Sequence, residues 1–436
     1  MSFRYLILLT LLLLNLFAVA LMWRSVAAWA RSRRLRVGLM AGIMVAVCLL
    51  NLPLFFFFLR GTDAFILSLP TSILKPVFYP ATAWIVTLMV VFVVGAPIAI
   101  LVALVKGVRK LLSPRSAGAP QPVLATAGPG FSRRQFLAGS TGLVVPALFS
   151  VSAYATYRGL DDLEVSRELT IPVRNLPRSL DGMTIVQLTD LHVGPYMREV
   201  ELQHLVSVVN GLNPDVVVLT GDMIDRHLSA LPDAVRGLTG FRPTLGSFAV
   251  LGNHDVSADR YSYTRQYRGG VEIAKGLASV GIRTLRNENI YLGTGQDRLA
   301  LMGLDWMRNP GTGGFYRYDE SGTRSVLTRL TAELASETPK VLLAHHPDTF
   351  SEVPPFDIAL TLAGHTHGAG QIVLGYVDGQ PIGLASFRFK YLSGLYQEKG
   401  CSLYVNRGVG YLGVPIRINC PPEISRFRLV RATSAS

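Results

Sequence analysis

Three long apolar stretches constrain the fold of this chain most strongly. They run from Tyr5 to Trp23, from Val37 to Leu59 and from Ala83 to Val105, and none contains a charged residue. A helix needs about 20 such residues to cross a bilayer. We therefore expect an all-α transmembrane region at residues 1–112, with spans at about 5–23, 37–59 and 83–105. The intervening piece from Phe65 to Ala81 contains three prolines, which favours an interfacial or re-entrant segment.

Charge is distributed unevenly along the 436 residues. The first 156 residues carry 14 lysines and arginines against one acid, Asp63, whereas the remainder carries 28 charges of each sign. The basic residues cluster between the first two apolar stretches and after the third, as they do at the cytoplasmic ends of membrane helices. The charge therefore predicts membrane topology, with an external amino terminus, and indicates no nucleic-acid partner.

A linker rich in Pro, Ala, Gly and Ser is expected at residues 113–131. Residues 132–157 then begin Ser-Arg-Arg-Gln-Phe-Leu and continue into a mildly hydrophobic stretch. This segment resembles a twin-arginine export signal, which would involve the twin-arginine export machinery, although such signals normally stand at the amino terminus. The alternative is a plain fourth span. Both interpretations predict a multi-pass protein of a bacterial inner or cytoplasmic membrane, with the rest of the chain on the periplasmic or extracellular side.

The three cysteines are too few for a disulfide framework. Cys48 lies within the second apolar stretch. Cys401 and Cys420 can pair if they face an oxidising compartment, but their spacing does not establish the geometry that a disulfide needs.

From Met183 onward, short apolar runs alternate with amphipathic segments, which predicts an α/β domain at residues 160–436. The stretch from Glu199 to Leu212 has apolar residues at helical spacing and precedes Pro214, as expected for a crossover helix. The expected strands are Thr184–Leu188, Val216–Leu219, Phe248–Leu251, Leu299–Met302, Val341–Leu343 and Ile358–Leu362.

Five short strings, TDLH, GDMID, GNHD, AHHP and AGHTHG, follow apolar runs in this domain. Ligands of an open α/β sheet gather at such strand ends. The strings supply carboxylates, imidazoles and one amide, which suit hard or borderline divalent cations, and no thiolate, which argues against a structural zinc cluster. The implied chemistry is two-metal hydrolysis of a phosphoester. Four histidines, two carboxylates and one asparagine of these strings are potential metal ligands.

In this order the strings resemble the calcineurin-like metallophosphoesterase superfamily, and more closely its bacterial membrane-associated branch, over roughly residues 169–429. The resemblance implies a metallophosphoesterase β-sandwich flanked by helices. It also implies that Asp190, His192 and His367 bind a first metal ion and that Asp222 bridges two. Asn253, His345 and His365 would bind the second ion, with His345 preferred over the adjacent His346 because it directly continues an apolar run.

The resemblance further implies in-line attack by a hydroxide shared between two divalent ions, which can be manganese, iron, zinc or magnesium. His254 would protonate the leaving oxygen or stabilise the phosphoryl group, Asp225 would orient that histidine, and Arg226 would clamp the phosphate. One departure from the family pattern is Ala369, which lengthens the loop after the last histidines. The stretch from Asn406 to Arg417 resembles a Gly-rich segment of the family, in which Arg407 or Arg417 lines the site or belongs to a structural turn.

Membrane anchoring favours an amphipathic substrate, so we expect a phosphodiester or pyrophosphate of a lipid-like phosphorylated molecule. One alternative is pyrophosphate cleavage in a UDP-2,3-diacylglucosamine-type precursor of lipid A, which would require a cytoplasmic site. An alternative of another class is a membrane sensor or scaffold whose phosphoesterase-like domain only binds ligand.

Overall fold

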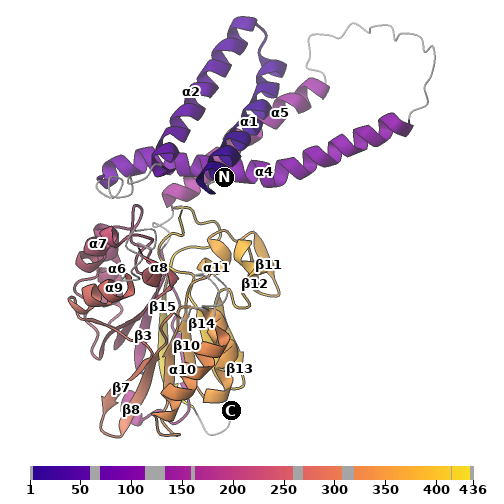
Figure 1. Cartoon of the computed structure of the whole chain (residues 1–436). Coiled ribbons are helices and arrows are strands. Elements are labelled where there is room, and N and C mark those ends of the chain that lie inside the picture. The colour runs from indigo at the N-terminus through magenta and orange to yellow at the C-terminus, as the bar shows by residue number, and fades with distance from the viewer. Residues whose placement is uncertain are drawn as a thin grey trace. The chain divides into compact units, whose positions relative to one another are not determined.

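The computed structural model describes residues 3–58, 69–112, 133–158, 163–258, 269–306, 319–413 and 415–432. They divide into two compact units, Met1–Tyr157 and Arg158–Ser436 (Figure 1). The linker expected at residues 113–131 lies outside the described residues.

The first unit consists of long helices. Three of them contain segments long and apolar enough to cross a membrane, at Leu8–Trp29, Arg33–Pro53 and Ser72–Arg109, and they overlap the three expected spans. The helix over the twin-arginine-like segment, α5, is not among these candidates. The helices are α1 (Phe3–Trp29), α2 (Arg33–Phe58), α4 (Thr71–Leu112) and α5 (Arg133–Arg158).

The structure differs from expectation at the proline-rich piece. Pro76 and Pro80 lie inside α4, so the described residues from Thr71 onward are the first turns of a long helix and not a separate segment. Proline removes one backbone donor and kinks a helix, but a strongly apolar sequence on its carboxyl side continues the helix because helical bonding satisfies the remaining backbone groups.

Polar side chains join three helices of this unit. The Asn15 and Asn51 amides hydrogen-bond to each other at 3.0 and 3.1 Å, and the Trp84 indole donates to Asn15 Oδ1 at 3.0 Å. Such amide bonds between apolar helices stabilise their packing and fix their register.

The second unit is built on two sheets. The first has the order β1-β15-β3-β4-β5-β6, with β2 also paired to β15, and the second has the order β13-β14-β10-β9-β8-β7. The strands of the first sheet are β1 (Glu164–Val165), β2 (Leu169–Val173), β3 (Thr184–Leu188), β4 (Val216–Thr220), β5 (Gly246–Val250), β6 (Ile282–Thr284) and β15 (Glu423–Arg431). Those of the second are β7 (Glu288–Thr294), β8 (Asp297–Gly303), β9 (Lys340–Leu343), β10 (Leu360–Ala363), β13 (Gly394–Glu398) and β14 (Cys401–Val405).

The apolar side chains of β4 show how the layers form. Val216 and Val218 pack against residues of the second sheet, whereas Val217 and Leu219 pack on the opposite face against helices. A strand covered on both faces is apolar throughout, which is why it appears as an uninterrupted apolar run in the sequence.

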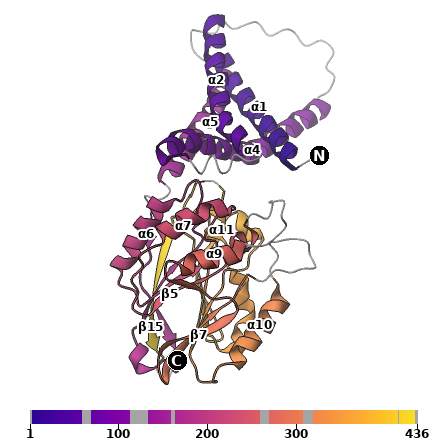
Figure 2. The same ribbon diagram turned by 60° about the vertical axis from the view of Figure 1, so that its left-hand side comes forward.

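Helices cover the outer face of each sheet (Figure 2). On the first sheet lie α6 (Glu199–Gly211), α7 (Leu231–Gly237) and α9 (Gly269–Ala278), and on the second lies α10 (Glu320–Ala332). This confirms the expected β-sandwich flanked by helices. Shorter helices in the connections are η1 (Arg178–Leu180), η2 (Leu228–Ala230), α8 (Asn253–Ser257), η4 (Pro347–Glu352), η5 (Pro354–Phe356) and α11 (His367–Gly370).

Cys401 and Cys420 are both buried and free, so the pairing that an oxidising compartment would allow is absent from the structure. Cys401 starts β14, whereas the Cys420 thiol lies 3.3 Å from the carbonyl of His367, beyond the far end of β10. Because β10 and β14 run parallel and in register, the length of a strand separates the two thiols.

Candidate metal centre

The five strings all follow parallel strands at one edge of the two sheets. TDLH, GDMID and GNHD come after β3, β4 and β5, and AHHP and AGHTHG come after β9 and β10. The short helices α8 and α11, which begin with Asn253 and His367, lie at this same edge (Figure 1). The sandwich therefore brings both sheets' strings together, as the strand-end argument predicts.

Several candidate ligands occupy strained backbone positions. The φ angles of Asp190, His192, Asp222, His365 and His367 are 53°, 45°, 53°, 74° and 48°, in the left-handed region that residues other than glycine rarely adopt. Such strain persists where the surrounding fold dictates it, and it is characteristic of functional sites.

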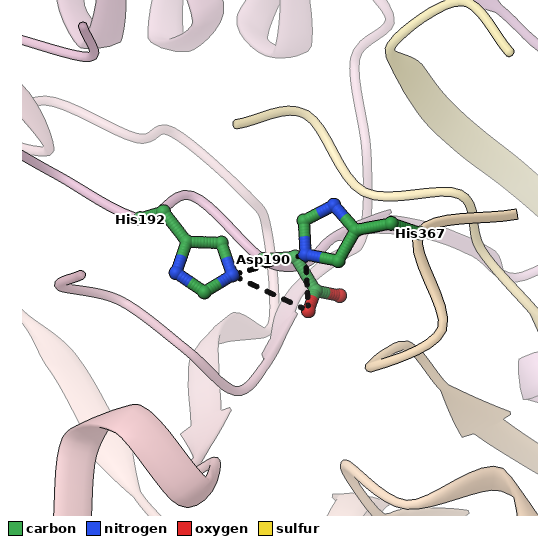
Figure 3. Close-up of side chains that lie close together, drawn as sticks. All are labelled: Asp190, His192 and His367. Carbon is green, nitrogen blue, oxygen red and sulfur yellow. Dashed lines mark hydrogen bonds and ion pairs between the residues drawn. The ribbon is translucent and has the colours of Figure 1, made fainter. Parts of the chain in front are cut away.

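One ligand group consists of Asp190, His192 and His367 (Figure 3). Nε2 of His367 lies 3.3 Å from Oδ1 of Asp190 and 3.0 Å from Nε2 of His192. The two imidazoles thus direct their Nε2 atoms at the same point as one carboxylate oxygen. All three side chains are buried.

The two carboxylate oxygens of Asp190 have different surroundings. Oδ2 accepts hydrogen bonds from the His365 backbone N–H at 2.9 Å and from the Thr189 hydroxyl at 2.8 Å. Oδ1 is buried and has no hydrogen-bond partner. Burial raises the pKa of Asp190, but His367 and His345 outweigh it, so the pKa is held below its usual range and the group stays ionised. Oδ1 is therefore a desolvated, charged oxygen available to a cation.

A second ligand group consists of Asp222, His345 and His365. Nδ1 of His345 donates to the Thr220 carbonyl at 2.7 Å, which leaves Nε2 directed at Asp222 Oδ2 across 3.2 Å. Nδ1 of His365 lies 3.2 Å from that same Nε2 atom. A ring fixed through one nitrogen presents the other as a ligand, which is the usual arrangement around metals in proteins.

Asn253 and His346, which the sequence also offers for this group, have different surroundings. The Asn253 side-chain oxygen is buried without a hydrogen-bond partner. His346 instead accepts a hydrogen bond from the Asp348 backbone at 3.2 Å and packs its ring against Trp306. Burial lowers the pKa of His346 to about 3, so its ring is neutral and packs beside the site. The structure thus places His345, and not His346, beside Asp222.

Asp222 lies between the two groups. Its Oδ2 is 3.7 Å from Nε2 of His192 in the first group and 3.2 Å from Nε2 of His345 in the second. Its Oδ1 accepts a hydrogen bond from the His254 backbone at 2.8 Å. This is the position that a bridging carboxylate requires.

His254 and Asp225 form a third cluster together with His192. Nδ1 of His254 donates to the backbone carbonyl of Asp225 and lies 3.6 Å from that residue's Oδ1 atom. Burial lowers the pKa of His254, but Asp222 and Asp225 raise it to a greater extent, so the net shift is upward. Arg226 is largely exposed, and its Nε atom lies 3.6 Å from the Asp225 carboxylate. The three clusters contain eight of the ten residues expected at the site; Asn253 precedes His254 in the chain, and Arg226 lies beside Asp225.

The donor set fits divalent cations. It combines imidazole nitrogens, carboxylate oxygens and one amide oxygen, and it includes two buried oxygens without partners, one on Asp190 and one on Asn253. Unpartnered buried oxygens are costly unless a ligand satisfies them. Cations bound by Asp190 and by Asn253 would do so.

Asp255 was not expected from the sequence. It is buried; one oxygen accepts from the Met223 backbone at 2.8 Å, and the other accepts from the Gly252 backbone at 2.9 Å. It therefore ties the GNHD loop to the GDMID loop. Burial raises the pKa of this carboxyl to about 7, with Asp222 adding to the shift. In the sequence, Asp255 could have been noticed only as the last residue of GNHD.

Arg407 and Arg417, the two arginines whose roles the sequence leaves open, have different surroundings. Arg407 pairs with Glu423 and Glu164, each at 2.7 Å, and serves the fold. Arg417 is buried, donates to the carbonyls of Gly410 and Arg407, and lies 3.5 Å from Nδ1 of His367. Arg417 thus supports the loop behind one ligand histidine. Ala369 is also buried, at a φ of 81°.

Comparison with known proteins gives the same class. A model of the calcineurin-like phosphoesterase family matches residues 183–369. A "Transmembrane protein with metallophosphoesterase domain" from Danio rerio is 34% identical over 308 residues, which cover 67% of this chain and 64% of that protein. The "Uncharacterized metallophosphoesterase YkuE" of Bacillus subtilis (strain 168) is 33% identical over 310 residues, which cover 68% of this chain and 97% of that protein.

A solved dimetal phosphatase from Danio rerio is 14% identical, with a TM-score of 0.31, and the match covers 52% of this chain and 88% of that chain. The region matched by this chain spans less than two thirds of the transmembrane protein from Danio rerio and nearly all of the Bacillus subtilis protein. The chain belongs to the calcineurin-like metallophosphoesterase family. Its amino-terminal unit contains three helices long and apolar enough to cross a membrane.

Proposed function

We propose that this chain hydrolyses a phosphodiester or a pyrophosphate with two divalent cations held at the candidate metal centre. The position of Asp222 carries the proposal, because one carboxylate oxygen lies within 3.7 Å of imidazole nitrogens from both ligand groups. Paired cations in hydrolases of this type stand about 3.5–4 Å apart and share such a carboxylate.

The residues that would hold the cations divide between the two groups. Asp190, His192 and His367 would hold one, Asn253, His345 and His365 the other, and Asp222 both. When bound, the two cations lower the pKa of water toward neutrality and polarise a phosphoryl oxygen. Manganese, iron, zinc and magnesium all accept this mixed set of donors.

His254 would donate a proton to the leaving oxygen. Its Nδ1 atom is bonded to Asp225, so its Nε2 atom is free to face substrate, and the neighbouring carboxylates favour the protonated ring. A protonated imidazole held in this way can donate to the leaving oxygen as the phosphorus–oxygen bond breaks. Asp225 would orient the ring, and the exposed Arg226 guanidinium would bind a phosphoryl oxygen.

The rest of the chain supports a proposal for the substrate class. Three apolar helices accompany the hydrolase unit, and relatives from Danio rerio and Bos taurus are named as transmembrane proteins with a metallophosphoesterase domain. We therefore propose a lipid-linked phosphodiester or pyrophosphate as substrate.

We also propose a bacterial inner or cytoplasmic membrane location, with the hydrolase unit on the periplasmic or extracellular side. The basic clusters between Arg24 and Arg36 and between Lys106 and Arg134 support this orientation. The twin-arginine export machinery would be the partner if the Arg133–Arg134 pair is recognised as a signal.

The test is hydrolysis of bis-p-nitrophenyl phosphate and p-nitrophenyl phosphate by the purified full chain, with manganese or with a chelator. We expect manganese-dependent cleavage of the diester that is lost in Asp222→Asn and kept in Asp297→Asn, which changes an exposed carboxylate at the start of β8. The metal content of dialysed protein should fall only in Asp222→Asn. Equal activity and metal content in both variants would contradict the proposed centre.

A further inference from the structure

Exposed apolar side chains gather on the segment that follows the last ligand string. This apolar hairpin, residues 372–389, contains β11 (Gly375–Val377), β12 (Gln380–Ile382) and the short helix η6 (Leu384–Phe387). Among the described residues of its unit, it supplies six of the thirteen exposed large apolar side chains. They are Leu374 (76% exposed), Tyr376, Val377, Ile382, Leu384 (70%) and Phe387 (91%).

The hairpin also has a buried side, so its outward residues are not simply a loop without packing. Ala385 and Phe389 pack inward on a cluster formed by Ala369, Val373, Leu392 and Cys420. Among the described strands, β11 and β12 pair only with each other. Apolar side chains that remain exposed singly are ordinary, but a contiguous set on a protruding element marks an interaction surface.

This surface borders the metal centre. The Phe389 ring lies 5.0 Å from the His365 ring, centroid to centroid, and 5.5 Å from that of His346. The hairpin stands beside α11, the helix that begins with His367 (Figure 1). A Cβ atom on Gly383 would lie 2.3 Å from the Ala369 carbonyl oxygen, so the two backbones are in close contact. Whatever binds the hairpin is therefore held next to the ligand histidines.

The composition of the hairpin and the rest of the chain identify the partner. The same chain carries three helices long and apolar enough to cross a membrane, which would tether the hydrolase unit to a bilayer. Leucine, isoleucine, valine and phenylalanine side chains with a tyrosine among them suit the boundary between acyl chains and headgroups. Arg388 and Lys390 are exposed beside them and attract anionic headgroups, whereas Asp378 at the turn is the single acid of the hairpin.

We propose that the apolar hairpin inserts into the surface of the bilayer to which the chain is anchored, so that the metal centre lies at the lipid surface. This docking goes beyond the hydrolysis proposed above and does not require turnover. It gives a lipid-linked substrate a route to the site in which only the headgroup has to leave the bilayer plane.

Fluorescence quenching in reconstituted vesicles tests the proposal. Full chain carrying Phe387→Trp is reconstituted into phosphatidylcholine and phosphatidylglycerol vesicles, with and without bromine on the acyl chains near the headgroup. The matched variant is Leu245→Trp, because Leu245 is 38% exposed and precedes β5 at the opposite edge of the sheet. Subtracting the signal of the parent chain removes the contribution of its four tryptophans.

We expect brominated lipid to quench the tryptophan introduced by Phe387→Trp and to leave the one introduced by Leu245→Trp unaffected. Adding Leu384→Ser to Phe387→Trp should lower the equilibrium constant for docking by roughly tenfold or more, the order expected when one buried leucine side chain is lost. Both changed positions of the hairpin are exposed, so neither change should disturb the fold.

Two results would overturn the proposal. One is equal quenching in the Phe387→Trp and Leu245→Trp proteins. The other is a Phe387→Trp protein whose introduced indole is shielded from aqueous iodide but is not quenched by brominated lipid. The hairpin would then be covered by protein, either a second copy or the chain's own helices.

Discussion

A methyl group added at Gly252 should disable the metal centre. A Cβ atom at this position would lie 2.1 Å from Oδ1 of Asp222, 2.6 Å from its backbone nitrogen and 2.8 Å from its Cγ atom. Contacts this short with backbone atoms cannot be relieved by rotating a side chain. The φ angle of Gly252 is −100°, so the need for glycine here is one of space and not of backbone conformation.

The cost of Gly252→Ala can be worked from these contacts. Overpacking a rigid site costs about 1–3 kcal/mol. Displacing Asp222 Oδ1 also breaks its 2.8 Å hydrogen bond from the His254 backbone, and a bond to a charged group is worth about 1.5–3 kcal/mol. A total of about 3–5 kcal/mol corresponds to a fall in Tm on the order of 10 °C for a unit of this size.

The assay is thermal unfolding of the detergent-solubilised full chain, with the metal content of dialysed protein measured in parallel. The control is Gly211→Ala at the end of α6, where nothing lies within 4 Å of the added methyl group and alanine should stabilise the helix by about 0.5–1 kcal/mol. A Gly252→Ala protein with the parent Tm and metal content would refute the packing argument.

Three further changes separate the roles of site residues. His254→Gln should lower kcat by roughly 10²- to 10⁴-fold without lowering metal content, and a loss of metal would make His254 a ligand instead of a proton donor. Arg417→Met should lower the free energy of unfolding by about 1–3 kcal/mol, because it leaves the Gly410 and Arg407 carbonyls without their donor. Arg226→Met changes an exposed side chain, so it should raise KM and leave Tm unchanged. The opposite pattern would mean that Arg417 binds substrate and Arg226 supports the fold. All three cysteines should be alkylated by iodoacetamide after denaturation without reductant, and a protected Cys401–Cys420 pair in peptide mass spectra would contradict the structure.

The sandwich core could be predicted from sequence because its parallel strands are buried on both faces. Thr184–Leu188 was expected and observed with identical bounds as β3, and the other expected strands differ from the observed ones by a few residues at their ends. The sequence does not predict β1, β2, β6, β7 or β11 to β15. Of these, β13 alternates between partly buried and exposed side chains and β7 has one fully buried side chain, so no continuous apolar run marks either strand. Strand β14 was not predicted either, although all five of its residues are buried.

In the first unit, too, the sequence predicts the apolar elements but not all of their bounds. Apolar length located the three candidate spans, but it could not show that the helix containing the third begins near Thr71, because prolines normally indicate a break. Orientation relative to the bilayer stays a prediction from the positions of the arginines.

The site residues could be predicted because each string sits directly after its strand, and parallel strands bring their carboxyl ends to one edge. What sequence could not provide was the set of supporting contacts. The role of Asp255 depends on two backbone N–H groups from different loops, and that of Arg417 on carbonyls brought together only by folding. Long-range contacts of this kind leave no local pattern.

On the proposed docking, the connection between the hairpin and the metal centre would determine which substrates reach the site. Ala369 occupies the additional position after the last ligand histidine, and its carbonyl lies against the Gly383 backbone, so the hairpin is fixed to the loop that presents His367. A soluble phosphodiester reaches the site whether or not the hairpin is docked, whereas a lipid-linked one is presented only at the bilayer surface. Replacing Leu384 and Phe387 with serine should therefore raise KM for a vesicle-embedded lipid phosphodiester while leaving cleavage of bis-p-nitrophenyl phosphate unchanged. Equal loss on both substrates would show that the hairpin supports the metal centre structurally and does not dock it to lipid.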